Sequence, residues 1–451
     1  MSADASPARR SGRLRALRRP RGFVWWLSPA GGVLLVAPAT IALAWATSDE
    51  RYREAWRSPK ALTDSGAVHL LAGVLVFAIG ALWPVAAASR PPVAGRWPYL
   101  DGRRHGLLAR AELPLFAMTM FGYVCLFLAG LSRGASPLLI VQVLLGSADA
   151  NVAKSQFAPI AGVTTFTQFG VGYVVVAALL LAAGGASRGL RLRLGALLLC
   201  AALRAFGLSE RLALLELTIP LLVVAATVTW ARRGAWARAA VALLPALLLP
   251  TLVVLFAVSE RLRSWQFYGA RGGSPFSTFV LDRLSGYYVT AYNNGELLVE
   301  HAGFPGRLPY DNLGWLWAAP GAEQADLYTR LTGENAGTNT FTVLRQYGNI
   351  EFNNPGGFGT VYLDFGRWGG LAYLLLCGTV LGLAFVAFVR GRLAGLLLYP
   401  ILAIGVFELP RYVYWSAGRA TPALAACVLL VLLFRQGRRR AVPVPSRSVA
   451  A

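Results

Sequence analysis

Long uninterrupted apolar runs constrain the fold of this sequence more than any other feature. Runs of about 18 to 25 residues recur along the chain, and each is long enough to cross a hydrocarbon core roughly 30 Å thick. The chain is 56% hydrophobic and only 14% charged, which is far more apolar than an ordinary soluble protein. Because the runs are continuous rather than alternating, we expect helices and not a transmembrane β-barrel. The sequence therefore predicts an all-α polytopic membrane protein.

The apolar runs predict about ten transmembrane helices, two of which come from one continuous run. Residues 192–231 would measure about 60 Å as a single helix, twice the thickness of a bilayer. The segment "FGLSER" at 206–211 is therefore expected to divide this run into a hairpin. The segment 137–147 is apolar but short, and we expect it to be re-entrant or interfacial. The predicted spans are 23–47, 67–89, 113–131, 160–183, 192–207, 211–231, 239–259, 368–389, 393–410 and 419–434.

The positive charge predicts the orientation of the chain in the membrane. The formal net charge is +22, and much of it lies in short loops and tails beside the apolar runs. This is the positive-inside pattern. We therefore expect a multi-pass membrane protein with both termini on the cytoplasmic side. The expected partners of these arginines are anionic lipids and not nucleic acid.

The predicted organisation has five parts. Residues 1–22 form a disordered basic cytoplasmic tail, residues 23–259 form helices 1–7, and residues 435–451 form a second cytoplasmic tail. Residues 260–367 form one large extracytoplasmic loop with short helices, and residues 368–434 form helices 8–10. The loop is rich in Gly, Pro, Asn and aromatic residues, so we expect it to pack on the membrane face.

Nothing in the sequence indicates a metal or cofactor. The four cysteines all fall inside apolar runs, where they are expected to act as small core residues. There is no CxxC or Cys/His metal spacing, and the three histidines are scattered.

Charged residues at the predicted outer ends of the spans are the candidates for chemistry. A charge near the centre of a span costs about 2.5 to 3.5 kcal/mol, so charges that converge there are expected to be paired or functional. Snorkelling of the charged tips to water is the alternative for each one. Arginine suits phosphate, because its planar fork binds two oxygens. The arginines singled out are Arg204, Arg211, Arg345 and Arg411, and the candidate bases and orienting groups are Asp364, Glu210 and His301.

Aromatic residues of the predicted loop could stack on sugar rings. Tyr287, Tyr288 and Trp315 are the candidates, and an aromatic belt at the bilayer interface is the alternative reading.

Three motifs carry a resemblance to a known family. They are "SGYYVTAYNN" at 285–294, "GTNTFTVLRQYG" at 337–348 and "TVYLDFGRWGG" at 360–370. Together they resemble the bacterial oligosaccharide repeat-unit polymerases of the O-antigen polymerase type. The insertion "NIEFNNPGGFG" between the last two motifs departs from that family's usual spacing.

The resemblance implies a GT-C-like glycosyltransferase bundle in the bacterial cytoplasmic (inner) membrane, with an extracytoplasmic active site. Its donor and acceptor would be oligosaccharides linked to undecaprenyl pyrophosphate, and its other partners a chain-length regulator and a flippase. Such an enzyme needs no metal and no cofactor. The four arginines would then stabilise the departing diphosphate. Asp364 would orient the loop or the acceptor hydroxyl, or alternatively cap the eighth span.

Three other readings remain open. A ligase of the O-antigen type would share this chemistry and architecture. A relative of the dolichol-phosphate-type mannosyltransferases would carry an acidic pair in its first external loop, where this chain has Asp49 and Glu50. A flippase or other transporter would have more spans, shorter loops and a repeated half.

Overall fold

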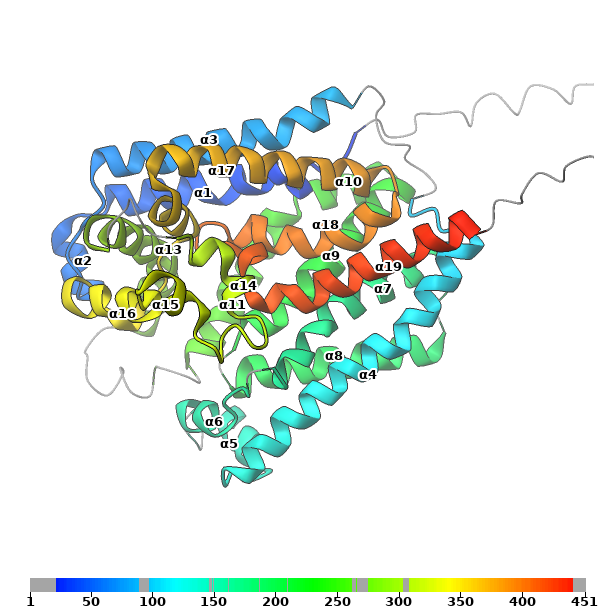
Figure 1. The fold of residues 1–451 in the computed structure, drawn as a ribbon, viewed down its shortest axis with the longest axis horizontal. Helices are drawn as coiled ribbons and strands as arrows, with labels where there is room; N and C mark the ends of the chain where they lie inside the picture. The colour runs from blue at the N-terminus through cyan, green and yellow to red at the C-terminus, as the bar shows by residue number, and fades with distance from the viewer. Residues whose placement is uncertain are drawn as a thin grey trace, which may run out of the picture.

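The computed structural model is a helical bundle (Figure 1). It describes residues 22–88, 97–145, 148, 150–160, 162–185, 187–208, 210–261, 265, 275–302 and 308–440. Every regular element among these residues is a helix. The predicted N-terminal tail lies outside the described residues except for its last position, and so does the C-terminal tail beyond residue 440.

Seven helical segments are long and apolar enough to cross a membrane, and there are eight if one bent pair counts as a single span. The bent pair is α10 (Ala235–Ala242) with α11 (Leu244–Glu260), which meet at 51°. The seven lie in α1 (Pro29–Ala46), α3 (Asp64–Ala87), α4 (Gly102–Ser132), η2 (Thr164–Gln168) with α7 (Phe169–Ala182), α9 (Leu212–Arg232), α17 (Gly357–Val389) and α19 (Thr421–Arg440) with the short turn before it.

Two further predicted spans are helices of the same bundle, but they are not long and apolar enough to count as candidate membrane spans. Helix α8 (Arg188–Gly207) carries four arginines, and α18 (Leu393–Glu408) has only 16 residues. The structure thus shows seven to eight candidate spans rather than ten. The predicted hairpin is confirmed, because α8 ends at Gly207 and α9 begins at Leu212.

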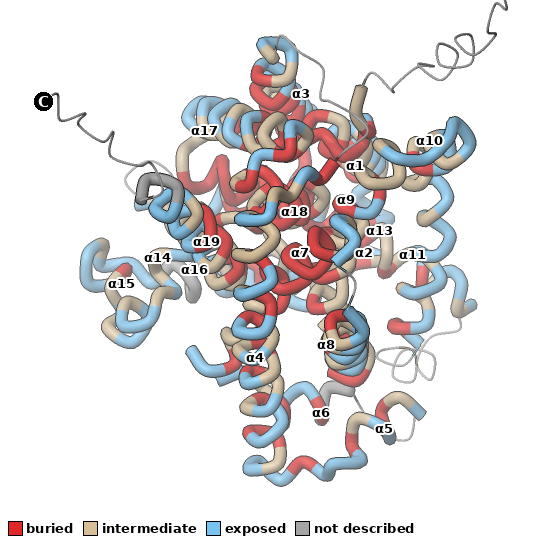
Figure 2. Tube along the Cα trace, turned by 90° about the vertical axis from the view of Figure 1, so that its right-hand side faces the viewer, coloured by how far each residue is buried: buried red, intermediate tan, exposed pale blue. Residues whose placement is uncertain are grey.

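The outer surface of the spans is apolar, as a lipid-facing surface must be. Large side chains such as Leu75 and Ile79 of α3 and Leu376 and Val380 of α17 are exposed. Figure 2 shows the exposed faces on the outside of the bundle and the buried residues at its centre. A soluble protein rarely exposes so many large apolar side chains, so the surface agrees with a membrane protein.

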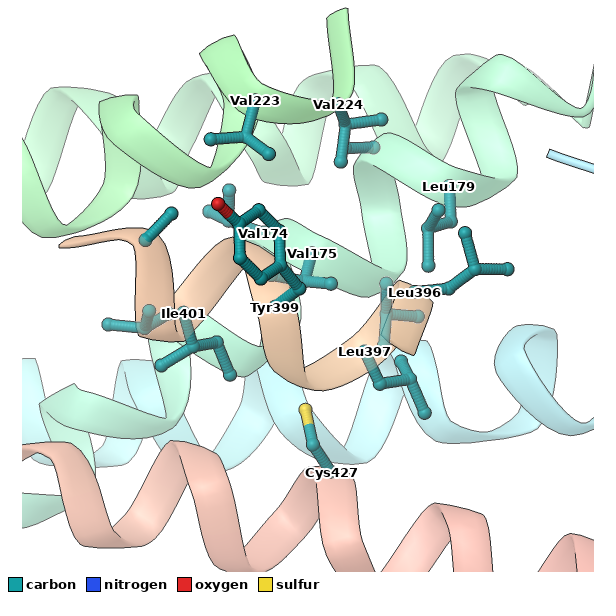
Figure 3. Close-up of a cluster of buried hydrophobic side chains, with 14 of the residues drawn as sticks. Val174, Val175, Leu179, Val223, Val224, Leu396, Leu397, Tyr399, Ile401 and Cys427 are labelled. Carbon is teal, nitrogen blue, oxygen red and sulfur yellow. The ribbon is translucent and has the colours of Figure 1, made fainter. Parts of the chain in front are cut away.

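The largest apolar core surrounds α7, which is buried along almost its whole length. Figure 3 shows Val174 of α7 in the same cluster as Val223 of α9, Leu397 of α18 and Cys427 of α19. A second core joins α1, α3, α13 (Phe276–His301) and α17. The bundle therefore has two packed halves.

Backbones touch directly where α3 crosses α17. A Cβ atom at Gly378 would lie 2.2 Å from the carbonyl oxygen of Phe77, and one at Gly80 would lie 2.4 Å from that of Leu375. Gly382 meets another α3 carbonyl at 2.4 Å. Small residues allow this approach between membrane helices. We call this contact the glycine seam.

The predicted extracytoplasmic loop gathers with other short elements at one end of the bundle, opposite the end where α4 begins and α19 ends (Figure 1). The loop does not contain only short helices, because α13 has 26 residues. Its mixture of polar and apolar positions gives no continuous apolar run. The short elements at this end are α2 (Asp49–Trp56), α5 (Leu139–Leu144), α6 (Ala150–Gln156), η4 (Asp311–Leu313), α14 (Gly314–Trp317), α15 (Leu327–Thr332), α16 (Ala336–Tyr347) and η5 (Ile350–Phe352).

Helix α17 begins inside the predicted loop, at Gly357. Its first turns are buried, and Gly366 then interrupts the helix with φ 68° and ψ 169°. Only glycine adopts this backbone conformation readily. The motif "TVYLDFGRWGG" is therefore a helix, a kink and the start of the long apolar segment.

Candidate functional site

The buried carboxylate of Glu260 joins three helices at the end of the bundle where the short elements gather. Glu260 ends α11, is fully buried and pairs with Arg211, which precedes α9. Its second oxygen lies 3.5 Å from Nε of Arg283 in α13. Nη1 of Arg283 donates to Glu351 at 2.7 Å, and Nε of Arg211 donates to the hydroxyl of Ser259 at 2.7 Å. Sequence reasoning missed Glu260, since it stands at the boundary of an apolar run like many solvated loop residues.

Two guanidinium groups lie close to the ring of Tyr287. The Cζ atom of Arg211 is 5.7 Å from the ring centroid, and that of Arg411 is 5.1 Å from it. Nη1 of Arg411 donates to Glu408 at 2.9 Å. Burial would lower the pKa of Arg411, but Glu408 and the nearby tyrosines outweigh it and raise the pKa above its ordinary value. Arg411 therefore stays a cation in a partly desolvated place.

The segment after α18 presents two donors that lack acceptors. Nε of Arg411 and the hydroxyl of Tyr412 are buried and have no hydrogen-bond partner among the described residues, whereas Tyr414 interacts with Glu216. Buried polar groups are nearly always paired in folded proteins. Two adjacent unpaired donors therefore mark a place that suits a ligand with acceptor oxygens.

Two more ion pairs adjoin this segment. Nε of Arg204 lies 2.5 Å from Glu210, and its Nη1 donates to Thr167 at 3.1 Å. Arg419 binds both oxygens of Glu216, at 2.7 and 2.8 Å. Sequence reasoning did not single out Arg419, because it lies in a short apolar turn with no motif around it. We call the ion pairs of Arg204, Arg211, Arg283, Arg411 and Arg419 the arginine network.

Each of these arginines has a carboxylate partner, so the network is close to neutral. A buried ion pair gains little net stability over apolar packing, but removing one partner leaves a costly buried charge. An incoming diphosphate would share these guanidinium groups with the carboxylates rather than find them free. The unpaired donors of Arg411 and Tyr412 would add to its hydrogen bonds.

Asp364 holds the preceding loop in place. Its Oδ1 accepts from the backbone N–H of Tyr310 at 3.0 Å, and its Oδ2 accepts from the N–H and Nδ2 of Asn312 at 2.8 and 2.9 Å. The side chain is 1% exposed. Asp364 does not cap the span, because α17 starts well before it. The contacts support its predicted role in orienting the loop.

The other predicted polar residues lie outside the arginine network. Arg345 is exposed on α16, and no contact among the described residues joins it to the network. The ring of His301 stacks on Tyr347 with centroids 3.8 Å apart. Arg367, beyond the kink, donates to Glu296 at 2.8 Å.

Of the predicted sugar-binding aromatic residues, two lie in or beside the arginine network and one lies outside it. Tyr287 lies in the network, and Tyr288 is beside Glu408 and Arg411, where burial and Glu408 raise its pKa. Its phenol therefore stays protonated and can donate. Trp315 is 45% exposed on α14.

Asp49, the first residue of the acidic pair between α1 and α3, has a structural role. Asp49 accepts from the backbone N–H of Lys60 and from Nε of Arg53, both at 2.8 Å. These contacts lower its pKa below the ordinary value. Among the described residues, no three His, Cys, Asp or Glu side chains form a group able to hold a metal.

Comparisons with protein-family models, with curated proteins and with solved structures found no match to this chain.

Proposed function

We propose that this chain is a membrane glycosyltransferase that polymerises oligosaccharide repeat units carried on undecaprenyl pyrophosphate. The observation that supports the proposal is that Arg211 and Arg411, which come from different parts of the chain, both bring their guanidinium groups to the ring of Tyr287. Guanidinium groups bind diphosphate oxygens, and an aromatic ring beside them can pack against a sugar, so the arrangement suits a lipid diphosphate attached to a sugar. The resemblance of the three loop motifs to the repeat-unit polymerases favours the same reaction.

In the proposed reaction, the terminal hydroxyl of one lipid-linked unit attacks the anomeric carbon of the growing chain. A new glycosidic C–O bond forms, and the bond from that carbon to the diphosphate oxygen breaks. The diphosphate leaves with the electron pair, and the hydroxyl proton passes to a base. Negative charge grows on the leaving group, and preorganised guanidinium groups in a partly dry site stabilise it.

The structure revises the set of residues that we propose for this step. Arg211 and Arg411 would contact the diphosphate, and Arg204 would support them through Glu210. Asp364 would act as a positioning residue, because its oxygens are engaged by the 310–312 loop. Of the predicted bases, Glu210 lies in the arginine network, and we propose it as the base.

The proposed topology keeps ten spans by including α8 and α18. The basic loops and both termini would then face the cytoplasm of a bacterium, and the arginine network would face outward. Donor and acceptor would both be lipid-linked units already moved to the outer leaflet of the cytoplasmic membrane.

The test is reconstitution of the purified protein in liposomes with lipid-linked repeat units, read as a ladder on a gel. We expect Arg411→Ala to lower the rate about 10² to 10³-fold, the usual effect of losing one preorganised donor. Arg345→Ala is the matched control, because it removes the same group from an exposed site outside the network. Arg211→Ala is made together with Glu260→Gln, so that no uncompensated buried charge remains.

Other outcomes would contradict the proposal in distinguishable ways. A full ladder from folded Arg411→Ala protein would remove this residue from the mechanism. Transfer of finished glycan to a different acceptor would indicate a ligase. Movement of intact units across the liposome membrane without any bond formation would indicate a transporter.

A further inference from the structure

A basic cavity lies at the end of the bundle opposite the arginine network. It has a volume of about 650 Å³ and opens between the start of α4 and the end of α19. These two helix ends lie together at the right of Figure 1. Both belong to candidate spans, so the cavity lies at the depth where a span leaves the hydrocarbon core. The cavity contains no residue of the three motifs and no residue of the proposed reaction.

The polar wall of the cavity is cationic. Arg103, Arg104 and Arg110 line it, against a single acidic residue, Asp101. Arg104 is fixed by bonds from Nη1 to the carbonyls of Tyr99 and Gly391 at 3.2 and 3.0 Å. Arg103 and Arg110 are exposed and have no acceptor within the described part of the chain.

The rest of the lining is largely apolar. Leu107 of α4 lies on the same helix face as Arg103 and Arg110, Leu433 and Phe434 come from α19, and Phe434 lies 5.7 Å from the guanidinium of Arg104. Gly106 leaves open space in the cavity, because a Cβ atom there would meet nothing within 4 Å. An occupant of this cavity thus meets both guanidinium groups and hydrocarbon.

We propose that this cavity binds the headgroup and upper acyl chains of an anionic glycerophospholipid. The phosphate would bind Arg103 and Arg110, since guanidinium forks suit phosphate oxygens. The glycerol and first methylenes would lie on Leu107 and Leu433. A volume of about 650 Å³ falls in the range of small-molecule sites, which run from roughly 300 to 1,000 Å³.

The mixed lining favours a lipid over a free phosphate ion. A free ion would use only the arginines and would leave the apolar side chains in water. The position at the ends of two spans brings bilayer lipids to the cavity at high local concentration. This inference does not depend on the proposed glycosyltransferase activity.

The experiment counts bound lipid on the purified full-length protein by native mass spectrometry in detergent. The probes are dioleoylphosphatidylglycerol, dioleoylphosphatidylcholine with the same acyl chains, and inorganic phosphate. Each surface arginine contributes about five-fold to the affinity for an anionic lipid, so Arg103→Ala/Arg110→Ala is expected to bind phosphatidylglycerol about 25-fold more weakly. Gly106→Leu fills the cavity without removing charge and improves helix propensity, and it is expected to lose the same lipid.

The matched control is Arg188→Ala/Arg233→Ala, which removes two exposed arginines, one at the start of α8 and one at the end of α9, that do not line the cavity. We expect this control to keep wild-type binding, and thermal unfolding of each variant confirms that it folds. Equal binding by wild type and the Gly106→Leu variant would overturn the proposal. Equal binding of phosphatidylcholine, or equal loss in the control, would overturn it as well. Binding of inorganic phosphate as tightly as phosphatidylglycerol would show an anion site without a lipid role.

Discussion

Replacing Asp364 by asparagine tests whether this residue positions the loop around residues 310–312. The carboxylate accepts three hydrogen bonds, one from Tyr310 and two from Asn312, and it is almost fully buried. An asparagine can keep the two bonds from Asn312 if its oxygen takes the place of Oδ2. Its NH₂ group then faces the N–H of Tyr310, and two donors oppose each other.

The expected effect follows from these contacts. A hydrogen bond to a charged group contributes about 1.5 to 3 kcal/mol, and one is lost. The two that remain become neutral bonds, each weaker than before. We expect the loop to lose about 3 kcal/mol of docking free energy, which corresponds to roughly a 100-fold change in its opening equilibrium.

Hydrogen exchange measured by mass spectrometry reads this opening directly. The peptide covering residues 308–318 should exchange about 100-fold faster in Asp364→Asn than in wild type. Asp326→Asn is the control, because it makes the same chemical change at an exposed position of the same loop. Unchanged exchange in Asp364→Asn would refute the positioning role, and so would an equal acceleration in the control.

Three further predictions concern stability. Gly366→Ala should lower the stability in detergent by about 1 to 3 kcal/mol, because alanine is strained at φ 68° and ψ 169°; an unchanged melting temperature would contradict the kink. Glu216→Gln and Arg419→Met should each cost about 3 to 5 kcal/mol, whereas the double variant should recover most of the loss in thermal unfolding; additive losses would rule out the pair. Asp49 has a lowered pKa, first through the backbone N–H of Lys60, so its contribution is present above its ordinary pKa of 3.8 and is lost as pH falls through the lower folded value. Proteolysis of the 49–60 segment should therefore increase only below about pH 4, and Asp49→Asn should abolish this pH dependence.

The membrane helices were largely predictable because the bilayer fixes their length. The break at 206–211 followed from the same argument, since a run of 40 residues cannot remain one span. The predicted boundaries erred where helices continue beyond the apolar stretch. Helix α4 begins at Gly102, because Asp101 caps it and the first turns are polar. Helix α13 was missed as a long element because its polar residues interrupt the hydrophobic pattern.

The candidate site was predictable in residue type but not in pairing. The cost of buried charge directed attention to Arg211 and Arg411, and the fold brings both guanidinium groups close to the ring of Tyr287. The sequence could not show that Glu260 would meet Arg211, because that contact depends on how distant helices cross. For the same reason, nothing in the sequence separated the exposed Arg345 from the arginines of the network.

The glycine seam makes α3 and α17 a single mechanical unit. Carbonyl oxygens of each helix lie where a Cβ of the other would have to be, so a rotation or a slide by one residue would drive a side chain into a backbone. Close-packed interiors move between discrete arrangements and do not deform continuously. Rotation or sliding of α3 against α17 is therefore blocked, and the pair forms a fixed frame within the bundle.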